Sequence, residues 1–445
     1  MNKSVEPSYS RADFGEDFVW GVATAAFQIE GATNTDGRGR SIWDTFCTKE
    51  EAIADGSNGD VACDHYNRLE QDLDHIADLG VNAYRFSVSW SRVRPSGDGP
   101  WNEKGFDFYD RLIAGLEQRG IQAHLTLFHW DLPQALDDRG GWLDEKVLDC
   151  FVEYAQEVTR RFGHRLASIC TFNEPWVISI LGYEKGVFAP GVQDRAVAMQ
   201  VAHNILVAHG RAVRAIRATS PSLSTGIVLN MSPIYAASED PADTEKAKID
   251  DGLIVRWYMD AICYGRYPID VLSYLGKDEP AVNAGDMSVI SEPIDFIGVN
   301  YYTRNFASTG NPWDVSSTGN QVTDMGWEVY PDGLCELLCR LHADYNVCKL
   351  MVTENGAAFK DEVIDGFVND LERQSYIQNH IAATLDARRL GVPVDGYFVW
   401  SLLDNFEWAS GYEKRFGIIH VDYETLERTP KASSLWLTKY LTGAI

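Results

Sequence analysis

Eight short apolar runs recur along this chain, and helix-like segments separate them. Runs of this length, rich in β-branched and aromatic residues, predict strands, whereas apolar residues at a spacing near 3.6 predict amphipathic helices. Strands that alternate with helices form a parallel sheet, and eight such units are the number that closes a barrel. We expect strands at residues 18–24, 82–88, 122–130, 168–173, 225–231, 295–302, 349–354 and 395–402.

The segments between these runs supply the helices of the same pattern. Helical spacing is found at residues 64–79, 105–119, 144–162, 196–218, 245–264, 331–345, 369–390 and 431–441. The chain has 445 residues, which is long for one core, but barrels with long loops often reach this size. No linker rich in Pro, Gly or Ser divides it. The sequence therefore predicts an α/β fold with a single (β/α)₈ TIM barrel over residues 1–445 and long βα loops.

The net charge argues against two classes of partner, and the cysteine content indicates the redox compartment. The formal net charge of −26 would repel a phosphate backbone or an anionic bilayer, so we expect neither nucleic acid nor membrane as a partner. No stretch approaches the length of a membrane span, and residues 1–18 lack the apolar core of a signal peptide. The eight cysteines are dispersed, which favours free thiols in a reducing compartment. We predict a cytoplasmic protein and leave homo-oligomerisation open.

Several predicted strands change character at their C-terminal ends. An apolar body gives way to polar and aromatic residues in FHWD (128–131), FNEP (172–175), VNYY (299–302), TENG (353–356) and WS (400–401). In a closed parallel barrel these ends meet at one rim, which is where barrel enzymes carry their active sites. The sequence therefore brings distant polar residues into one candidate site.

Two glutamates, Glu174 and Glu354, follow the predicted fourth and seventh strands. Glycoside hydrolysis requires two carboxyl groups, one on each side of the scissile bond. A glutamate in a loop is more often a solvated surface charge. Position alone therefore leaves both interpretations open.

Longer motifs around these glutamates resemble family 1 glycoside hydrolases, the family of β-glucosidases and β-galactosidases. TFNEP at 171–175 is similar to the family motif T-x-N-E-P, and VTENG at 352–356 contains the family motif T-E-N-G. The resemblance extends over nearly the whole chain, from FVWGVATAAFQIEG at 18–31 to WSLLDNFEW at 400–408 and RFG at 415–417.

The resemblance implies separate roles for the two glutamates. Glu174 matches the general acid/base and Glu354 the nucleophile of a retaining enzyme, whose carboxyl groups lie about 5–5.5 Å apart. Arg85 and Tyr302 match the groups that support the nucleophile in its ionised form. A structural salt bridge remains the alternative reading of Arg85.

The resemblance also implies a set of substrate-binding residues. They are Gln28, His129, Trp130, Asn173, Asn300, Tyr302, Trp400, Glu407, Trp408 and Phe416. The leaving-group side is expected to involve Trp130, Trp176, Leu181, Phe188 and Trp327. Because a carboxylate such as Glu407 would repel a phosphate, neutral sugars are favoured over 6-phosphosugars.

The expected activity is that of a retaining β-glucosidase, which removes terminal β-D-glucosyl residues from cello-oligosaccharides and from aryl or alkyl glucosides. Action on β-galactosides or β-fucosides and transglycosylation are alternatives on the same site. A 6-phospho-β-glucosidase and a non-catalytic sugar-binding protein are further alternatives. No cofactor is required, and the spacing of His124 and His129, like that of His203 and His209, does not match a metal site.

Overall fold

In the computed structural model, which describes residues 9–444, eight parallel strands close a barrel. Around the barrel the strand order is β1, β12, β9, β7, β5, β4, β3, β2. The strands are β1 Val19–Ala23, β2 Ala83–Ser87, β3 Gln122–Phe128, β4 Leu166–Asn173, β5 Ser224–Asn230, β7 Phe296–Asn300, β9 Leu350–Asn355 and β12 Val394–Trp400. The predicted (β/α)₈ barrel is confirmed, and its eight strands lie where they were expected, with ends that differ by one or two residues.

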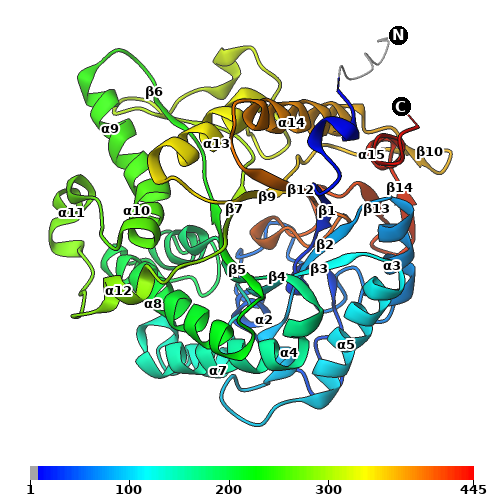
Figure 1. Cartoon of the computed structure of the whole chain (residues 1–445), viewed down its shortest axis with the longest axis horizontal. Helices are drawn as coiled ribbons and strands as arrows, with labels where there is room; N and C mark the ends of the chain where they lie inside the picture. The colour runs from blue at the N-terminus through cyan, green and yellow to red at the C-terminus, as the bar shows by residue number, and fades with distance from the viewer. Residues whose placement is uncertain (1–8, 445) are drawn as a thin grey trace.

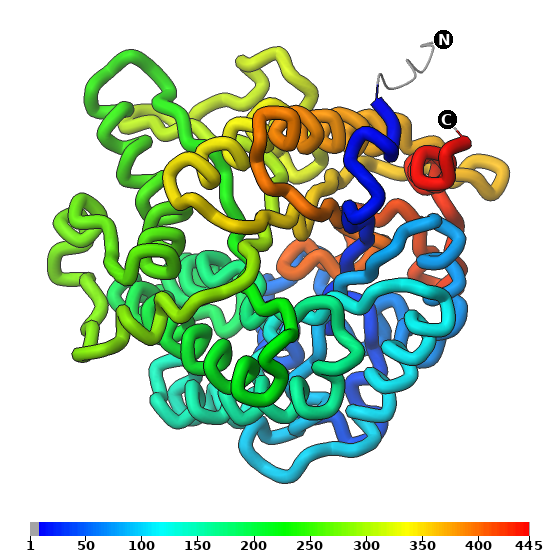
Figure 2. The backbone as a smooth tube through the Cα atoms, viewed as in Figure 1, coloured from blue at the N-terminus to red at the C-terminus, as the bar shows by residue number. Residues whose placement is uncertain are grey.

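Helices surround the barrel, so its strands are buried on both faces (Figure 1). Burial on both faces explains why these strands appear as continuous apolar runs rather than as alternating patterns. β2, for example, is buried along its whole length. The chain passes once around the barrel from the N-terminus to the C-terminus, as the colour of the tube shows (Figure 2).

The long helices between the strands agree with most of the predicted ranges. They are α3 Leu69–Asp78, α5 Glu103–Gln118, α7 Glu145–Phe162, α8 Arg195–Thr219, α9 Pro241–Asp251, α10 Trp257–Tyr264, α13 Pro331–Tyr345, α14 Leu371–Arg389 and α15 Ala432–Thr442. Two predictions were wrong in detail. The helix expected from residue 64 begins at Leu69, because Asp64 adopts a left-handed φ of 55° in a turn. The helix expected over 245–264 is divided by the π-helical turn η5 Gly252–Arg256.

Long loops follow the C-terminal ends of several strands and contain elements of their own. Three two-stranded sheets pair β6 Ile234–Ala236 with β8 Asn305–Ala307, β10 Val363–Ile364 with β11 Phe367–Val368, and β13 Ile419–Val421 with β14 Arg428–Pro430. The shorter helices are α1 Ala26–Ile29, α2 Ile42–Phe46, α4 Trp90–Val93, α6 Gln134–Asp137, α11 Ile269–Leu275 and α12 Asp286–Ile290. The remaining elements are a second π-helical segment and six 3₁₀ turns. They are η4 Val177–Glu184, and η1 Arg11–Phe14, η2 Gly141–Leu143, η3 Gly163–Arg165, η6 Gly276–Asp278, η7 Val315–Thr318 and η8 Trp408–Ser410.

The first and last described segments pack against each other beside the barrel. Arg11 donates a hydrogen bond from Nη1 to the carbonyl of Leu441 at 2.7 Å, and the rings of Tyr9 and Tyr440 are 5.9 Å apart. The predicted domain over residues 1–445 includes residues 1–8 and 445, which lie outside the described residues. The prediction that residues 1–18 lack the apolar core of a signal peptide also lies outside them where it concerns residues 1–8. Within residues 9–444, no helix is long and apolar enough to cross a membrane.

Candidate active site

The C-terminal ends of the barrel strands surround a cavity of about 240 Å³. Ten of the predicted catalytic and sugar-binding residues line it, together with all five residues predicted for the leaving-group side; Trp130 belongs to both groups. The first group comprises His129, Trp130, Glu174, Asn300, Tyr302, Glu354, Trp400, Glu407, Trp408 and Phe416; the second comprises Trp130, Trp176, Leu181, Phe188 and Trp327. Arg85, Asn173 and Gln28 do not line the cavity. They form hydrogen bonds to residues that line it or to the segments that carry such residues, as described below.

Glu354 lies at the end of β9 between a cation and a phenol. Arg85 on β2 donates from Nη1 to Glu354 Oε1 at 2.7 Å, and Tyr302 donates its hydroxyl to Oε2 at 2.7 Å. The side chains of Arg85 and Glu354 are only 2% and 4% exposed. Burial and the charge of Glu354 raise the pKa of Tyr302 well above its usual value, so the phenol stays a donor. Both oxygens of Glu354 are therefore held by donors, which suits a carboxylate.

Glu174 follows β4 in different surroundings. Its Oε1 accepts a hydrogen bond from Asn300 Nδ2 at 2.5 Å, and the side chain is buried. Burial, and then the negative charge of Glu354, raise the pKa of Glu174 to about 8. Burial is thus the larger cause of the raised pKa, ahead of the neighbouring carboxylate of Glu354. At neutral pH Glu174 carries a proton that it can donate, as a general acid must.

Asn173 connects the two glutamates. Its Oδ1 accepts from Arg85 Nη2 at 2.7 Å and from Asn300 Nδ2 at 3.1 Å. Its Nδ2 lies 3.2 Å from His129 Nε2 and is the donor of this contact. The position of the Asn173 side chain is therefore fixed by three residues, Arg85 in β2, His129 directly after β3 and Asn300 at the end of β7.

His129 is a neutral imidazole with one free donor. Burial and the nearby Arg85 charge lower its pKa well below the usual value. Because Nε2 accepts from Asn173, the single ring proton lies on Nδ1, which has no partner within residues 9–444. An unpaired donor in a cavity wall is suited to a ligand oxygen, since a buried polar group without a partner is costly.

Two further buried oxygens, on Gln28 and Glu407, also have no hydrogen-bond partner within residues 9–444. Gln28 donates from Nε2 to the carbonyl of Phe406 at 2.8 Å, while its Oε1 has no partner among the described residues. Glu407 Oε2 is likewise unpaired in that range, and burial raises the pKa of Glu407 to about 8. The imidazole N–H of His129 and one side-chain oxygen each of Gln28 and Glu407 are therefore available for hydrogen bonds, which sugar hydroxyls could form.

Aromatic rings form the apolar part of the same wall. The ring of His129 stacks on Trp400 with centroids 5.8 Å apart and on Trp408 at 6.0 Å. Trp43 is buried behind Trp408, with its ring centroid 4.6 Å away. It therefore supports the wall from the core. The exposed faces of such rings suit the apolar face of a sugar.

Three residues that line the cavity adopt left-handed backbone conformations. Trp130, Glu174 and Trp408 have φ values of 83°, 52° and 49°. Such conformations are rare for residues other than glycine, and they cluster at functional sites when surrounding packing holds them. At Trp130 the conformation also ends β3 two residues earlier than predicted.

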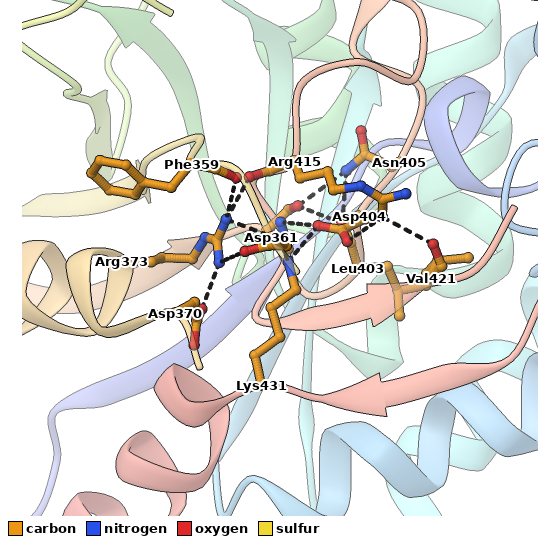
Figure 3. Close-up of polar contacts among 12 residues, drawn as sticks. Phe359, Asp361, Asp370, Arg373, Leu403, Asp404, Asn405, Arg415, Val421 and Lys431 are labelled. Atoms are coloured by element: carbon orange, nitrogen blue, oxygen red, sulfur yellow. Dashed lines mark hydrogen bonds and ion pairs between the residues drawn. The ribbon is translucent and has the colours of Figure 1, made fainter. Parts of the chain in front are cut away.

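A buried network of charges holds the loop that follows Trp400 and carries Glu407 and Phe416. The charged residues of this network are drawn in Figure 3. Asp404 accepts from Lys431 Nζ at 2.7 Å and from Arg415 Nη1 at 2.7 Å, and also from the backbone N–H of Gly417. The side chains of Asp404 and Lys431 are fully buried.

The same network reaches the loop that follows Glu354. Lys431 also binds Asp361, and Arg373 on α14 pairs with Asp361 at 3.0 Å and with Asp370. Arg373 donates further to the carbonyls of Ala357 and Arg415. Three acids and three bases therefore balance each other and join the loop after β9 to the loop after β12 (Figure 3).

The charge network also engages a cation that could otherwise bind a phosphate. Arg415 is bound to Asp404 and to the carbonyl of Val421. No cluster of three or more potential metal ligands is present in the part of the chain that the structure describes. All eight cysteines are free thiols, as predicted.

Several cavity residues were not anticipated from the sequence. Asn230 is the last residue of β5, Met231 and Ser232 follow this strand, Ile254 lies in η5, and Met325 lies in the loop after β8. The polar end of the fifth predicted strand was a signal for Asn230 and Ser232. Ile254 and Met325 carry no local signal, because an apolar residue in a helix or loop is usually part of the core.

Comparison with known proteins agrees with this geometry. The model of glycosyl hydrolase family 1 matches residues 10–443. β-Glucosidase A of Acetivibrio thermocellus is 44% identical over 441 residues, which cover 96% of this chain and 98% of that protein. β-Glucosidase A of Thermotoga maritima is 45% identical over 429 residues, covering 95% and 96%. The structure of β-glucosidase from Thermotoga maritima in complex with glucoimidazole superposes with a TM-score of 0.93 at 44% identity, covering 96% of this chain and 98% of that chain. This chain belongs to glycosyl hydrolase family 1.

Proposed function

We propose that this protein is a retaining β-glucosidase that uses Glu174 as general acid/base and Glu354 as nucleophile. The observation that carries the proposal is the contrast between the two carboxyl groups. Glu354 is held by the Arg85 guanidinium and the Tyr302 hydroxyl, whereas burial keeps the pKa of Glu174 at about 8. Two carboxyl groups in such different surroundings are what a double displacement needs.

In the first step Glu354 attacks the anomeric carbon while Glu174 protonates the leaving oxygen. The bond to the leaving group breaks, and a glycosyl ester forms at Glu354. The ester has no charge, so one cause of the raised pKa of Glu174 disappears. Glu174 is then a carboxylate that removes a proton from water, and this water releases the sugar with its configuration retained.

The proposed sugar site uses the unpaired groups of the cavity wall. His129 Nδ1–H donates to one hydroxyl, while Gln28 Oε1 and Glu407 accept from others. Asn173, fixed by Arg85 and Asn300, is proposed to meet the 2-hydroxyl. Trp400, Trp408 and Phe416 form the apolar surface for the ring, and Trp130 and Asn300 complete the set.

The proposed substrates are neutral β-glucosides, from short cello-oligosaccharides to aryl and alkyl glucosides. A phosphorylated sugar is disfavoured because Arg415 is already engaged by the carboxylate of Asp404. We further propose that residues 1–445 act as one catalytic domain in the cytoplasm and contribute to cellulose degradation. The net charge of −26 supports a protein without nucleic-acid or membrane partners, and gel filtration would determine whether it forms a homo-oligomer.

A panel of nitrophenyl glycosides tests the proposal. The wild type should hydrolyse the β-glucoside, with the β-galactoside and β-fucoside as arms that rank the sugars. Glu354→Gly should abolish hydrolysis, and azide or formate should restore it in part by taking the place of the missing carboxylate. Failure of the wild type on every arm would favour a non-catalytic sugar-binding protein. Glycosyl transfer to an added alcohol would measure transglycosylation.

A further inference from the structure

Two cysteines lie one helical turn apart on α13, outside the candidate active site. Cys335 and Cys339 are four residues apart in this helix, so their side chains lie on the same face. Their thiols are joined by a side-chain hydrogen bond. Neither residue lines the cavity that contains Glu174 and Glu354. The two thiols are therefore a separate cluster, which the proposed reaction does not use.

The thiol pair lies at the margin of the core, where α13 and α14 lie side by side (Figure 1). Both side chains are partly buried and pack against the hydrophobic core. Burial, and then the neighbouring Cys339, raise the pKa of Cys335 to about 12. A protonated thiol reacts slowly with oxidants and alkylating agents, because the thiolate is the nucleophile. A single cysteine here would be a packing residue, and the contact between two thiols is what distinguishes this position.

The helical spacing of the two thiols does not suit a disulfide. Side chains four residues apart on a helix have Cβ atoms about 5–6 Å apart. A disulfide requires a Cβ separation of about 3.5–4.5 Å. Direct bonding of the sulfurs would therefore distort α13, which is regular from Pro331 to Tyr345. An atom inserted between the two sulfurs spans the larger separation without this distortion.

The number of ligands decides which kind of atom can be inserted. Zinc takes at least three protein ligands in its sites. Within residues 9–444, no group of three or more His, Cys, Asp or Glu residues could hold a metal ion. A centre that needs only two sulfur ligands fits instead. Organic arsenic in the +3 state is such a centre, because a carbon group fills its third valence and its pyramidal bonds keep two sulfurs close together.

We propose that Cys335 and Cys339 form a dithiol site that binds an organic arsenical in the +3 oxidation state. With phenylarsine oxide, both S–H bonds break and each sulfur forms one bond to arsenic. The oxide oxygen leaves as water with the two protons. Arsenic stays in the +3 state, so the step needs no oxidant or reductant. The site is independent of the proposed β-glucosidase function.

Peptide mapping of the wild-type protein tests the proposal. Phenylarsine oxide is added to the folded protein at one equivalent, and the protein is then digested with trypsin. Cleavage after Arg304, Arg340 and Lys349 places Cys335 and Cys339 together on peptide 305–340 and the exposed Cys348 on peptide 341–349. One phenylarsenic group should be found on peptide 305–340. Arsenic on another peptide, or none on the folded protein, would overturn the proposal.

Competition by free thiols tests whether both sulfurs bind the arsenic. A dithiol such as 2,3-dimercaptopropanol should remove the phenylarsenic group, because it too offers two sulfurs in one molecule. Glutathione, which has one thiol, should not remove it at the same concentration. Removal by glutathione as readily as by the dithiol would contradict a bridge between Cys335 and Cys339.

A matched pair of substitutions locates the site. Cys335→Ser removes one of the two arsenic–sulfur bonds, so the affinity for phenylarsine oxide should fall by about 10²–10⁴-fold. Cys348→Ser makes the same chemical change at an exposed thiol and should keep the wild-type affinity. Equal affinities of the two variants would overturn the proposal. The mapping of the wild-type protein decides the same question without depending on the folding of a variant.

Discussion

Substitution of Arg85 by Met tests the buried charge pair at the base of the site. Arg85 donates to three acceptors, the carbonyl of Thr353 at 3.2 Å, Glu354 Oε1 at 2.7 Å and Asn173 Oδ1 at 2.7 Å. A methionine side chain has a similar length but no donor. The variant therefore leaves the buried carboxylate of Glu354 without its cation and releases the side chain of Asn173.

The expected loss of stability follows from the burial of both partners. Breaking a buried ion pair by removing one partner costs about 3–5 kcal/mol, because the remaining charge stays out of water. Denaturation in urea, with an unchanged slope, would measure this difference in the free energy of unfolding. Removing both charges in the double variant Arg85→Met, Glu354→Gln should cost less than Arg85→Met alone, because no unpaired charge remains.

An exposed pair provides the control. Arg211 and Asp149 are 30% and 66% exposed, so Arg211→Met should change the free energy of unfolding by at most about 1 kcal/mol. The reasoning would be refuted if Arg85→Met cost no more than this control. It would also be refuted if the double variant were less stable than Arg85→Met by the full cost of a second substitution.

Three other outcomes follow from the site. For an alkyl glucoside, kcat/KM should fall above about pH 8 as Glu174 loses its proton; a pH profile of Glu174→Gln on a dinitrophenyl glucoside, whose leaving group needs no acid, should lack this decrease. His129→Phe should raise KM for glucosides because the Nδ1 donor is lost, and should lower the free energy of unfolding by about 1–3 kcal/mol because the buried Nδ2 of Asn173 loses its acceptor; an unchanged KM would argue against the hydrogen bond from Nδ1 to the sugar. Asp404→Asn should lower the free energy of unfolding by about 3–5 kcal/mol, since Arg415 loses its counter-charge and Lys431 keeps only Asp361, and should raise KM because the loop with Glu407 is released. For Asp404→Asn, a lower stability with an unchanged KM would mean that the network stabilises the fold without positioning the loop.

The barrel could be predicted from the sequence because its strands are buried on both faces. Such strands appear as uninterrupted apolar runs, and their polar ends at Glu174 and Glu354 mark the rim. The helix over 245–264 was mispredicted because its apolar spacing continues through η5. A π-helical turn changes the hydrogen-bond pattern without a proline or glycine signal strong enough to indicate a break.

The candidate site shows the same contrast between residues that could be predicted from the sequence and residues that could not. Residues on the strand ends, such as Glu174 and Tyr302, could be named because their motifs lie next to recognisable strands. Ile254 and Met325 could not, because an apolar side chain that lines a cavity has the same sequence signature as one that fills a core. The link from Asp404 to Lys431 spans 27 residues and becomes visible only when the loop after β12 is folded onto α15.

Trapping of the covalent intermediate tests the central claim, that Glu354 is the nucleophile, most directly. A glucoside with fluorine at the 2-position and a dinitrophenolate leaving group forms the ester faster than the ester is hydrolysed. Mass spectrometry of the digested protein should then find one added fluoroglucosyl group on the peptide that contains Glu354. A label on another residue would contradict the assignment of the nucleophile, and product release with inverted configuration and no label would contradict the double displacement itself.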